Sequence, residues 1–323
     1  MNATDITIVI TTRNRADSLE HTLTRLTEHG EPWPIFVVDN ASQDGTADVV
    51  RRIRGDVEPV PDLPTTRACV AAAGAAPDHA SAPLIQTIPL SHNHAAAGRN
   101  FGVQAAGTRY VAFADDDSWW DPASLARAEE ILDANPHIGV VVARTIVEPH
   151  GTPDPITATL EASPLDSAGL PGPRLLGFLA CSAVVRVDAF HAVGGFSELL
   201  WFGAEEKLLS MDLTAAGWAI CYIDDALAHH MPSTRRPPPR WRRAIEQRNE
   251  LLICLMRRPP MTLLRRMARL ARAAPSDPVA RGALAGFLRR APAAYRLRRR
   301  LPASVEAMAA ALERPHQTEA KDT

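Results

Sequence analysis

The stretch YVAFADDDSWW, from Tyr110 to Trp120, decides how the rest of this 323-residue chain is interpreted. Its apolar first half has strand propensity and ends abruptly in the carboxylates of Asp115, Asp116 and Asp117. A buried strand delivers such acids to its carboxyl end, the edge at which open α/β sheets bind ligands. Because adjacent carboxylates repel one another, a cation would stabilise them, and oxygen ligands suit Mg²⁺ or Mn²⁺ bridging a diphosphate. Taken alone, the same acids are also typical of a solvated turn that caps the helix expected near Asp121.

Strands that end in polar turns also precede this stretch. The run 6–11 (ITIVIT) stops at TRNR and the run 35–38 (IFVV) stops at DNASQDGT, and a helical pattern follows each. This alternation predicts an α/β fold, a doubly wound and mostly parallel sheet with its loops on one edge. The Ala- and Pro-rich segment 56–83 interrupts the alternation and is predicted to be a surface insertion.

The net charge of −2 hides an acidic body and a basic tail. Residues 1–231 hold 14 Lys and Arg against 30 Asp and Glu, whereas residues 232–303 hold 19 against 3. The four cysteines have no metal-ligand or CxxC spacing, which favours a reduced, cytoplasmic protein. No run of about 18 apolar residues occurs, so we expect no transmembrane segment. Few lysines with abundant Ala, Arg and Pro are typical of a GC-rich bacterial genome.

Four segments in this order, VITTRNR, VVDNASQDGT, AGRNFGV and FADDDSW, resemble the motifs of the family 2 glycosyltransferases. The resemblance runs from about residue 5 to about residue 232 and does not cover the tail. It implies a GT-A domain at 1–232. From composition we expect a basic helical region at 233–312 and a disordered tail at 313–323. The resemblance also implies a hexosyltransferase-type enzyme that moves a sugar, with inversion, from a nucleotide-diphosphate sugar to a hydroxyl acceptor.

The resemblance implies roles for the acids and for two histidines near residue 230. Asp117 would contact the metal, Asp115 would contact the ribose or the water shell of the metal, and Asp116 would lie against the donor. His229 or His230 would complete the coordination, since histidine is a common ligand at open sites. The alternative is that both are ordinary residues at the end of a strand.

The first two loops and the AGRNFGV segment would bind the donor. By resemblance, Asp39 accepts a hydrogen bond from the imide nitrogen of the base, which favours UDP or dTDP. Asp39 could instead only cap its own turn. Arg13 stands where the family often has Tyr, and both side chains can stack on the base. The residues expected to contact the donor are Thr12, Arg13, Asp39, Asn40, Arg99 and Asn100.

The general base is expected in FGAEEKLLSMDLTAAGW, residues 202–218. The family places an acid before a helix of the LSxxL type, and that alignment selects Glu206, where an Asp is more usual. Its neighbour Glu205 is the alternative base. Acids in the first turn of a helix also favour the helix dipole, which is a purely structural explanation of the pair.

Other functions remain open from the residues alone. A nucleotidyltransferase would show a Gly-rich first loop, which TTRNR is not, and a nucleotide-sugar-binding protein without turnover would share the donor motifs. The Arg-rich segment 257–300 contains an apolar stripe, so it could contact a membrane surface or pack against the acidic body. Nucleic acid is disfavoured because the tail has few aromatic residues. Processive synthases that resemble the family carry Gln-x-x-Arg-Trp, and here Pro237 stands at the Gln position, so we expect single-sugar transfer.

Overall fold

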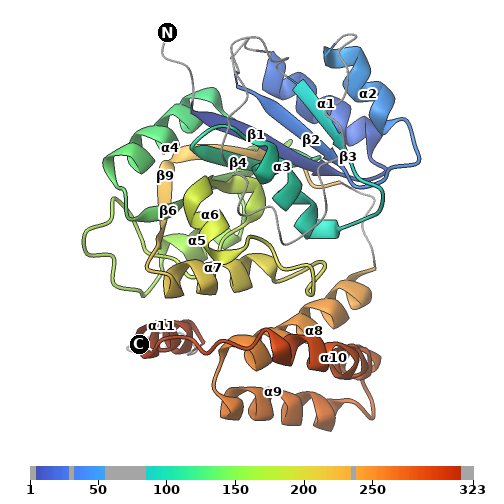
Figure 1. Cartoon of the computed structure of the whole chain (residues 1–323), viewed down its shortest axis with the longest axis vertical. Helices are drawn as coiled ribbons and strands as arrows, with labels where there is room; N and C mark the ends of the chain where they lie inside the picture. The colour runs from blue at the N-terminus through green and yellow to red at the C-terminus, as the bar shows by residue number, and fades with distance from the viewer. Residues whose placement is uncertain (1–4, 29–32, 55–84, 234–237, 314–323) are drawn as a thin grey trace, which may run out of the picture.

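The computed structural model describes residues 5–28, 33–54, 85–233 and 238–313. Figure 1 shows a curled sheet with helices on both sides and, beneath it, the helices of the C-terminal part of the chain. The predicted insertion at 56–83 and the tail from residue 314 onward lie outside the described residues. Glu313, the first residue assigned to that tail, is described, and its carboxylate lies 2.5 Å from the guanidinium of Arg258.

One sheet forms the centre of the body. Its strands are β1 Ile6–Thr12, β2 Ile35–Asp39, β3 Ile85–Pro89, β4 Tyr110–Asp115, β5 Ser118–Trp120, β6 Ile138–Val147, β7 Thr152–Pro153, β8 Ala183–Arg186 and β9 Ala219–His230. Their order is β3-β2-β1-β4-β8-β6-β9-β5, and β7 pairs with β6. Strands β3, β2, β1 and β4 are parallel, as are β6 and β9, whereas β8 runs antiparallel between β4 and β6. The mostly parallel sheet predicted from the alternation is therefore confirmed.

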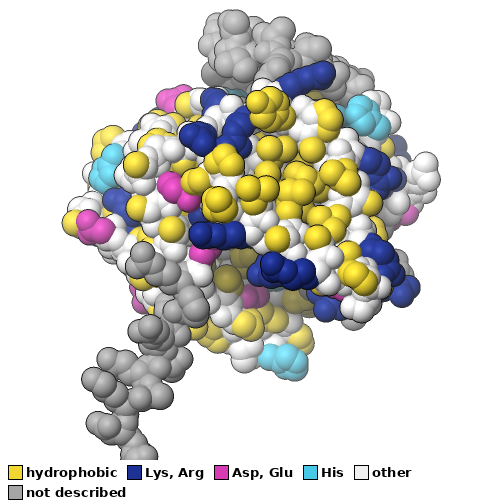
Figure 2. Space-filling view, turned by 90° about the horizontal axis from the view of Figure 1, so that it is seen from below, with side chains coloured by type: hydrophobic (Ala, Val, Ile, Leu, Met, Phe, Trp, Pro, Cys, Tyr) yellow, Lys and Arg dark blue, Asp and Glu magenta, His cyan; other side chains and the backbone are white. Residues whose placement is uncertain are grey.

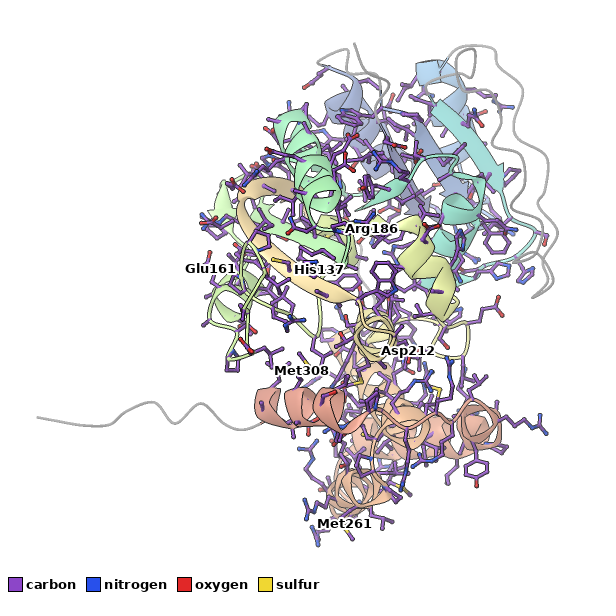
Figure 3. The ribbon with its side chains drawn as sticks, turned by 60° about the vertical axis from the view of Figure 1, so that its left-hand side comes forward. His137, Glu161, Arg186, Asp212, Met261 and Met308 are labelled. Atoms are coloured by element: carbon purple, nitrogen blue, oxygen red, sulfur yellow. The ribbon has the colours of Figure 1, made fainter. Side chains whose placement is uncertain are left out.

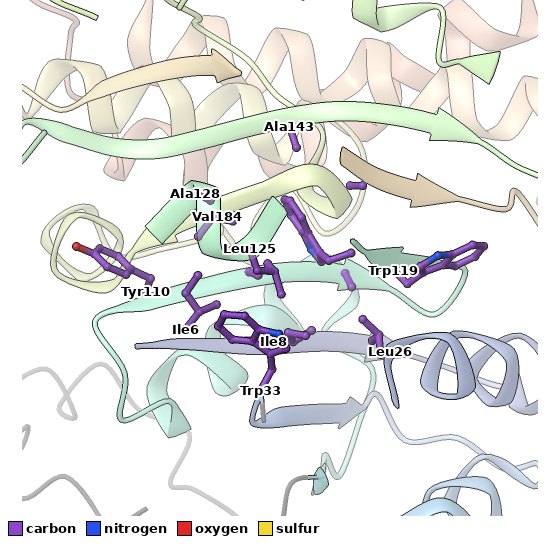
Figure 4. Close-up of a cluster of buried hydrophobic side chains, with 14 of the residues drawn as sticks. Ile6, Ile8, Leu26, Trp33, Tyr110, Trp119, Leu125, Ala128, Ala143 and Val184 are labelled. Atoms are coloured by element: carbon purple, nitrogen blue, oxygen red, sulfur yellow. The ribbon is translucent and has the colours of Figure 1, made fainter. Parts of the chain in front are cut away.

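The helices lie on both faces because alternate strand residues point in opposite directions. Ile6, Ile8 and Ile10 of β1 join a cluster with helices α1 Ala16–Thr27, α2 Thr46–Arg54 and α4 Pro122–Ala134 (Figure 4). Val9 joins the opposite cluster, which includes α3 Arg99–Ala105, α5 Ile156–Glu161, α6 Val187–Val193 and α7 Glu205–Ala215. Two 3₁₀ turns, η3 Ala95–Gly98 and η4 Ala180–Ser182, precede α3 and β8.

The register of the parallel strands aligns the ends of the sequence motifs. Thr12 lies opposite Asp39 across β1 and β2, and Thr11 lies opposite Asp115 across β1 and β4. The polar loops that follow these strands therefore leave the sheet at one edge. This is the edge where the sequence predicted the ligand.

The C-terminal helices are α8 Pro239–Arg257, α9 Pro260–Ala273, α10 Pro278–Arg296 and α11 Ala303–Leu312. Apolar residues of α8–α11 share a core with Leu200, Leu208 and Met211 of the body. In Figure 3, Asp212 lies where α7 meets these helices, and Met261 lies at their far end. No described helix is long and apolar enough to cross a membrane. The basic region thus packs against the body through α7.

Candidate active site

Strained backbone gathers in the loops at the carboxyl edge of the sheet. Asn14, Ala41 and Ala95 follow β1, β2 and β3, and Trp201 and Ala204 precede α7. All have a positive φ, which is uncommon for residues other than glycine. Such conformations persist only where the surroundings impose them, and they cluster at functional sites.

The three acids after β4 have different partners. Asp115 accepts a hydrogen bond from Arg99 at 2.5 Å. Asp116 accepts from the Thr12 hydroxyl at 3.0 Å and from Arg15 at 2.9 Å. The same Arg15 nitrogen lies 3.0 Å from Asp117, so one guanidinium joins two of the acids.

These surroundings act differently on Asp116 and Asp117. Burial raises the pKa of Asp116 to about 7, against the opposing effect of Arg15. Asp117 is also buried, but His230, the amide of Ser233 and Arg15 together hold its pKa below the usual value. Asp117 therefore stays ionised at neutral pH and is the better cation ligand of the two.

The donor set at Asp117 fits a divalent metal. The carboxylate oxygen Oδ2 accepts from Arg15 and from the Ser233 amide at 3.2 Å, whereas Oδ1 faces the imidazole Nε2 of His230 at 3.5 Å. The other ring nitrogen of His230 is buried and has no hydrogen-bond partner among the described residues. Within that part of the chain, no group of three or more His, Cys, Asp and Glu is arranged to hold a metal. A cation at this carboxylate and imidazole would take its other ligands from phosphate and water.

The two candidate histidines point to opposite sides of β9. The Nδ1 atom of His229 lies 2.9 Å from Glu148, and its ring stacks on Trp119 with centroids 5.4 Å apart. His229 is therefore placed away from Asp117, and the structure brings only His230 of this pair to the acids.

The four candidate donor-binding residues at the ends of β1 and β2 differ in their contacts and in their exposure. Asp39 accepts from the amide of Ser42 at 2.8 Å, the turn-capping role that the sequence left open. The Asn40 amide is held by the loop before η3, because its oxygen accepts from His94 N at 3.1 Å and its nitrogen donates to Ala95 O at 3.2 Å. Arg13 is exposed, whereas Thr12 is buried beside the acids.

Arg99 and Asn100 begin α3 and serve different purposes. Arg99 is buried between Asp115 and the Phe196 ring, whose centre is 5.5 Å from the guanidinium carbon. Asn100 donates to the carbonyl of Phe196 and accepts from its amide, both at 2.9 Å. A Cβ at Gly195, whose φ is +69°, would lie 2.7 Å from the Asn100 oxygen. The Asn100 amide group therefore holds the Gly194-Gly195-Phe196 turn.

The acidic pair stands at the first turn of α7. Glu205 is buried and Glu206 is half-buried, and Oε2 of Glu205 has no hydrogen-bond partner among the described residues. Burial raises the pKa of both carboxyls, that of Glu205 to about 8, while the positive charge of Arg99 opposes the shift. Glu205 and Glu206 are thus protonated more readily than an ordinary glutamate.

Arg15 is the main site residue that the sequence argument missed. It belongs to the quoted TRNR segment but was given no role. The available signal was its position, since the segment directly after β1 faces the end of β4 in a parallel pair. Its contacts with Asp116 and Asp117 make it part of the acidic cluster.

Solved structures of similar fold define the class of protein. A Pyrobaculum calidifontis mannosyltransferase, PcManGT, solved with GDP-Man and Mn²⁺, is 18% identical with a TM-score of 0.55, over 95% of this chain and 74% of that one. Residues 1–349 of S. aureus TarS, solved with UDP-GlcNAc, are 16% identical with a TM-score of 0.52, over 88% and 72%. GalNAc-T7, solved with UDP, GalNAc and Mn²⁺, is 12% identical with a TM-score of 0.53, over 78% and 48%. The chain therefore has the GT-A fold.

The family model for glycosyl transferase family 2 matches residues 7–194, more than half of the chain. The chain belongs to glycosyl transferase family 2, and the resemblance seen in its four motifs is confirmed. A comparison with curated proteins gave no match. The matched segment includes the acids after β4 and ends before the Glu205–Glu206 pair.

Proposed function

We propose that this glycosyltransferase moves a single sugar, with inversion and with the help of a divalent metal, from a nucleotide-diphosphate sugar to a hydroxyl acceptor. The observation that carries the proposal is the position of Arg99. Its guanidinium bonds Asp115 and raises the charged fraction of both Glu205 and Glu206. The donor acid Asp115 and the acidic pair of α7 therefore lie near the same buried cation.

The donor side of the proposed reaction uses Asp117 and His230 to hold Mg²⁺ or Mn²⁺. The metal would act as a Lewis acid on the diphosphate and so stabilise the departing nucleotide. Arg15 would balance the negative charge of Asp116 and Asp117. Asp115, held by Arg99, would face the donor. Mn²⁺ in two of the similar structures supports a divalent metal.

The acceptor side uses Glu206 as general base, with Glu205 as the alternative. A base works best when its pKa lies near the working pH, and burial moves both carboxyls in that direction. Inversion follows from a single displacement in which the acceptor hydroxyl loses its proton to the carboxylate. A protein that binds nucleotide sugars without turnover is the competing proposal, and it requires neither base.

The proposed nucleotide is UDP or dTDP. The Oδ1 atom of Asp39 accepts from the Ser42 amide, whereas its Oδ2 atom accepts no hydrogen bond from the described residues. This oxygen could take the imide proton of uracil or thymine, and the guanidinium of Arg13 could stack on the base.

The test is calorimetric titration with UDP, dTDP and GDP, each with and without Mn²⁺. We expect one nucleotide to bind wild type only with the metal, and we expect Asp117→Ala to abolish that binding. Asp121→Ala is the matched control, since it removes a neighbouring acid that only caps α4, at a cost of about 1 kcal/mol of stability. If folded wild type binds none of the three nucleotides with metal present, the transferase proposal is wrong.

We also propose that the C-terminal helices contact an anionic membrane surface. Figure 2 shows apolar side chains gathered on the face seen from below, with Lys or Arg side chains around them. Large apolar residues are exposed on α9 (Met261, Leu264) and on α10 (Leu288, Tyr295). Asp277 is the sole acid between residues 260 and 296, a segment with eight arginines. Apolar side chains among arginines suit a bilayer that contains anionic lipid.

Vesicle co-sedimentation tests the membrane contact. Wild type should sediment with vesicles of equal parts phosphatidylglycerol and phosphatidylcholine, and not with pure phosphatidylcholine. The double variant Leu264→Asp, Leu288→Asp should lose this binding. Arg51→Glu on α2 makes the same change in net charge away from this face and should retain it. An equal loss of vesicle binding in both variants would mean that net charge alone causes the binding, and would contradict a contact through this particular face.

A further inference from the structure

Two polar residues of α8 are buried and form hydrogen bonds with the backbone of the loop that precedes α7. Arg248 is 7% exposed and Asn249 is 0% exposed. The Asn249 amide nitrogen is within hydrogen-bond distance of the carbonyls of Leu200 at 3.1 Å, Phe202 at 2.9 Å and Gly203 at 2.5 Å. These residues end two positions before Glu205. The amide nitrogen of Asn249 thus contacts only the backbone that leads into the acidic pair.

Arg248 contacts the same loop, and Arg248 and Asn249 together form a clamp on residues 200–203. It donates to the Leu200 carbonyl at 2.8 Å and to the side-chain oxygen of Asn249 at 2.9 Å, which orients the amide group of Asn249. Among the described residues no carboxylate forms a salt bridge with Arg248, so its buried charge is costly to keep. Space for it exists because α10 has Gly286 there, where a Cβ would lie 2.9 Å from Cδ of Arg248.

The clamped loop does not hold its shape by local preference. Trp201 and Ala204 have φ of 66° and 64°, and left-handed backbone costs roughly 1–2 kcal/mol for each residue other than glycine. Ala204 also begins α7 without a side-chain cap. Two neighbours hold the loop: α8 takes the carbonyls named above, and Ala96 of η3 donates its amide to the Trp201 carbonyl at 3.0 Å.

The contact with η3 connects the clamped loop to the residues expected to bind the donor. Ala96 lies three residues before Arg99, and Arg99 bonds the donor acid Asp115. The loop therefore contacts both α8 and the turn that precedes Arg99, and Glu205 follows the loop after one residue. A shift of the loop would move the acidic pair relative to the donor.

We propose that Arg248 and Asn249 are positioning residues of sugar transfer: they fix loop 200–203 and thereby the distance of the acidic pair from the donor edge. This inference rests on the proposed function, in which a carboxylate of that pair is the base. A displacement of about 1 Å can cost two orders of magnitude in rate. The C-terminal helices are then part of the catalytic unit.

The test compares two contacts that α8 makes, one with loop 200–203 and one with α7. Asn249→Ala removes the clamp at the start of α7. Asp212→Asn breaks the pair between Asp212 and Arg257, at 2.5 and 2.9 Å, two turns further along α7. The assay is release of nucleoside diphosphate, with water as acceptor, from the sugar nucleotide whose nucleotide binds in the titration. Thermal unfolding is measured in parallel.

We expect Asn249→Ala to lower kcat about 10- to 100-fold, with KM for the donor and nucleotide affinity within about threefold of wild type. Asp212→Asn should lower Tm comparably and leave kcat within about threefold. Equal losses of kcat in both variants, or a loss of nucleotide affinity that matches the loss of kcat in Asn249→Ala, would overturn the positioning role.

Gly286→Ala is the second variant if Asn249→Ala fails to fold. It keeps Asn249 and presses only on the Arg248 side chain, and we expect a smaller loss of kcat at unchanged donor KM. An unchanged kcat in a folded Gly286→Ala protein would overturn the role of Arg248. A wild type that neither binds nor consumes any sugar nucleotide would instead refute the proposed function, so the two failures are distinguishable.

Discussion

Asp117, which follows β4, and Glu205, in the first turn of α7, are carboxyl groups in opposite surroundings. Asp117 accepts hydrogen bonds from Arg15 and from the Ser233 amide and faces His230, and these neighbours hold its pKa below the usual value. Glu205 has an oxygen without a partner among the described residues, and burial raises its pKa to about 8. The donors around Asp117 keep it charged and suited to a cation, whereas Glu205, buried with few donors, is suited to proton transfer. Environment thus assigns different roles to like groups.

The largest effect that would test this contrast concerns the base. Glu206→Gln keeps the size of the side chain and removes proton acceptance, so we expect kcat for donor consumption to fall about 10²- to 10⁴-fold. Nucleotide affinity should stay within about threefold, because the donor acids are untouched. The measurement is nucleoside diphosphate release beside calorimetric titration.

Glu205→Gln is the matched control for the base, since it changes the neighbouring carboxyl in the same helical turn. We expect its loss of kcat to be at least tenfold smaller. The reverse ranking would make Glu205 the base, and two equally active variants would contradict a base in this pair altogether.

The next effect separates the two histidines of β9. His230→Ala removes the imidazole that faces Asp117, and we expect Mn²⁺-dependent nucleotide affinity to fall about 10- to 100-fold. His229→Ala removes a ring that contacts Glu148 and Trp119, so it should lower Tm more than affinity. Titration of both variants with the same nucleotide measures the difference, and a larger loss of affinity in His229→Ala would contradict the proposed ligand.

These histidines also show how far sequence reasoning reaches. The strand alternation, the family resemblance and the acids after β4 were predictable, because each depends on local pattern and parallel strand ends meet at one edge. Adjacent strand residues point to opposite faces, so at most one of His229 and His230 could reach the acids. Choosing His230 requires the pairing of β9 with β5 and β6, which no local pattern reveals.

Long-range contacts account for most of what the sequence argument left out. The direction of β8 is not encoded in the apolar run AVVR, since such a run suits either orientation. The grip of Asn249 on loop 200–203 spans more than 40 residues and follows no periodicity. The tail was open to membrane contact or packing, and its apolar stripe proved to be divided, with Leu270 buried and Leu264 exposed.

A smaller effect is the pH dependence of turnover. A protonated carboxyl is not a base, and burial raises the pKa of Glu206 above the ordinary value of 4.5. We therefore expect kcat to rise with pH and to reach its plateau at a higher pH than the plateau of about pH 6 that an exposed glutamate would give. Rates at saturating Mg²⁺ and donor between about pH 5 and pH 8 test the expectation, and a flat profile above pH 6 would contradict a base with a raised pKa.

The smallest effect is on stability and has the opposite sign from the effect on activity. Because the folded-state pKa of Glu205 is raised from 4.5 to about 8, the folded protein binds a proton that the unfolded chain releases. The free energy of unfolding should therefore decrease as pH rises from about 4.5 to about 8 and change little beyond. Glu205→Gln cannot ionise, so it should escape this loss.

We expect Tm of Glu205→Gln to exceed that of wild type at pH 8 by roughly 2–4 °C for each kcal/mol recovered, and to match it near pH 4. Asp121→Ala, which removes an acid that caps α4, should lower Tm at both pH values and so controls for the loss of a carboxylate. Thermal unfolding monitored by circular dichroism gives both comparisons. A Glu205→Gln protein that is less stable than wild type at pH 8 would mean that this carboxylate stabilises the fold. The proposed contrast between the environments of Asp117 and Glu205 would then be wrong for Glu205.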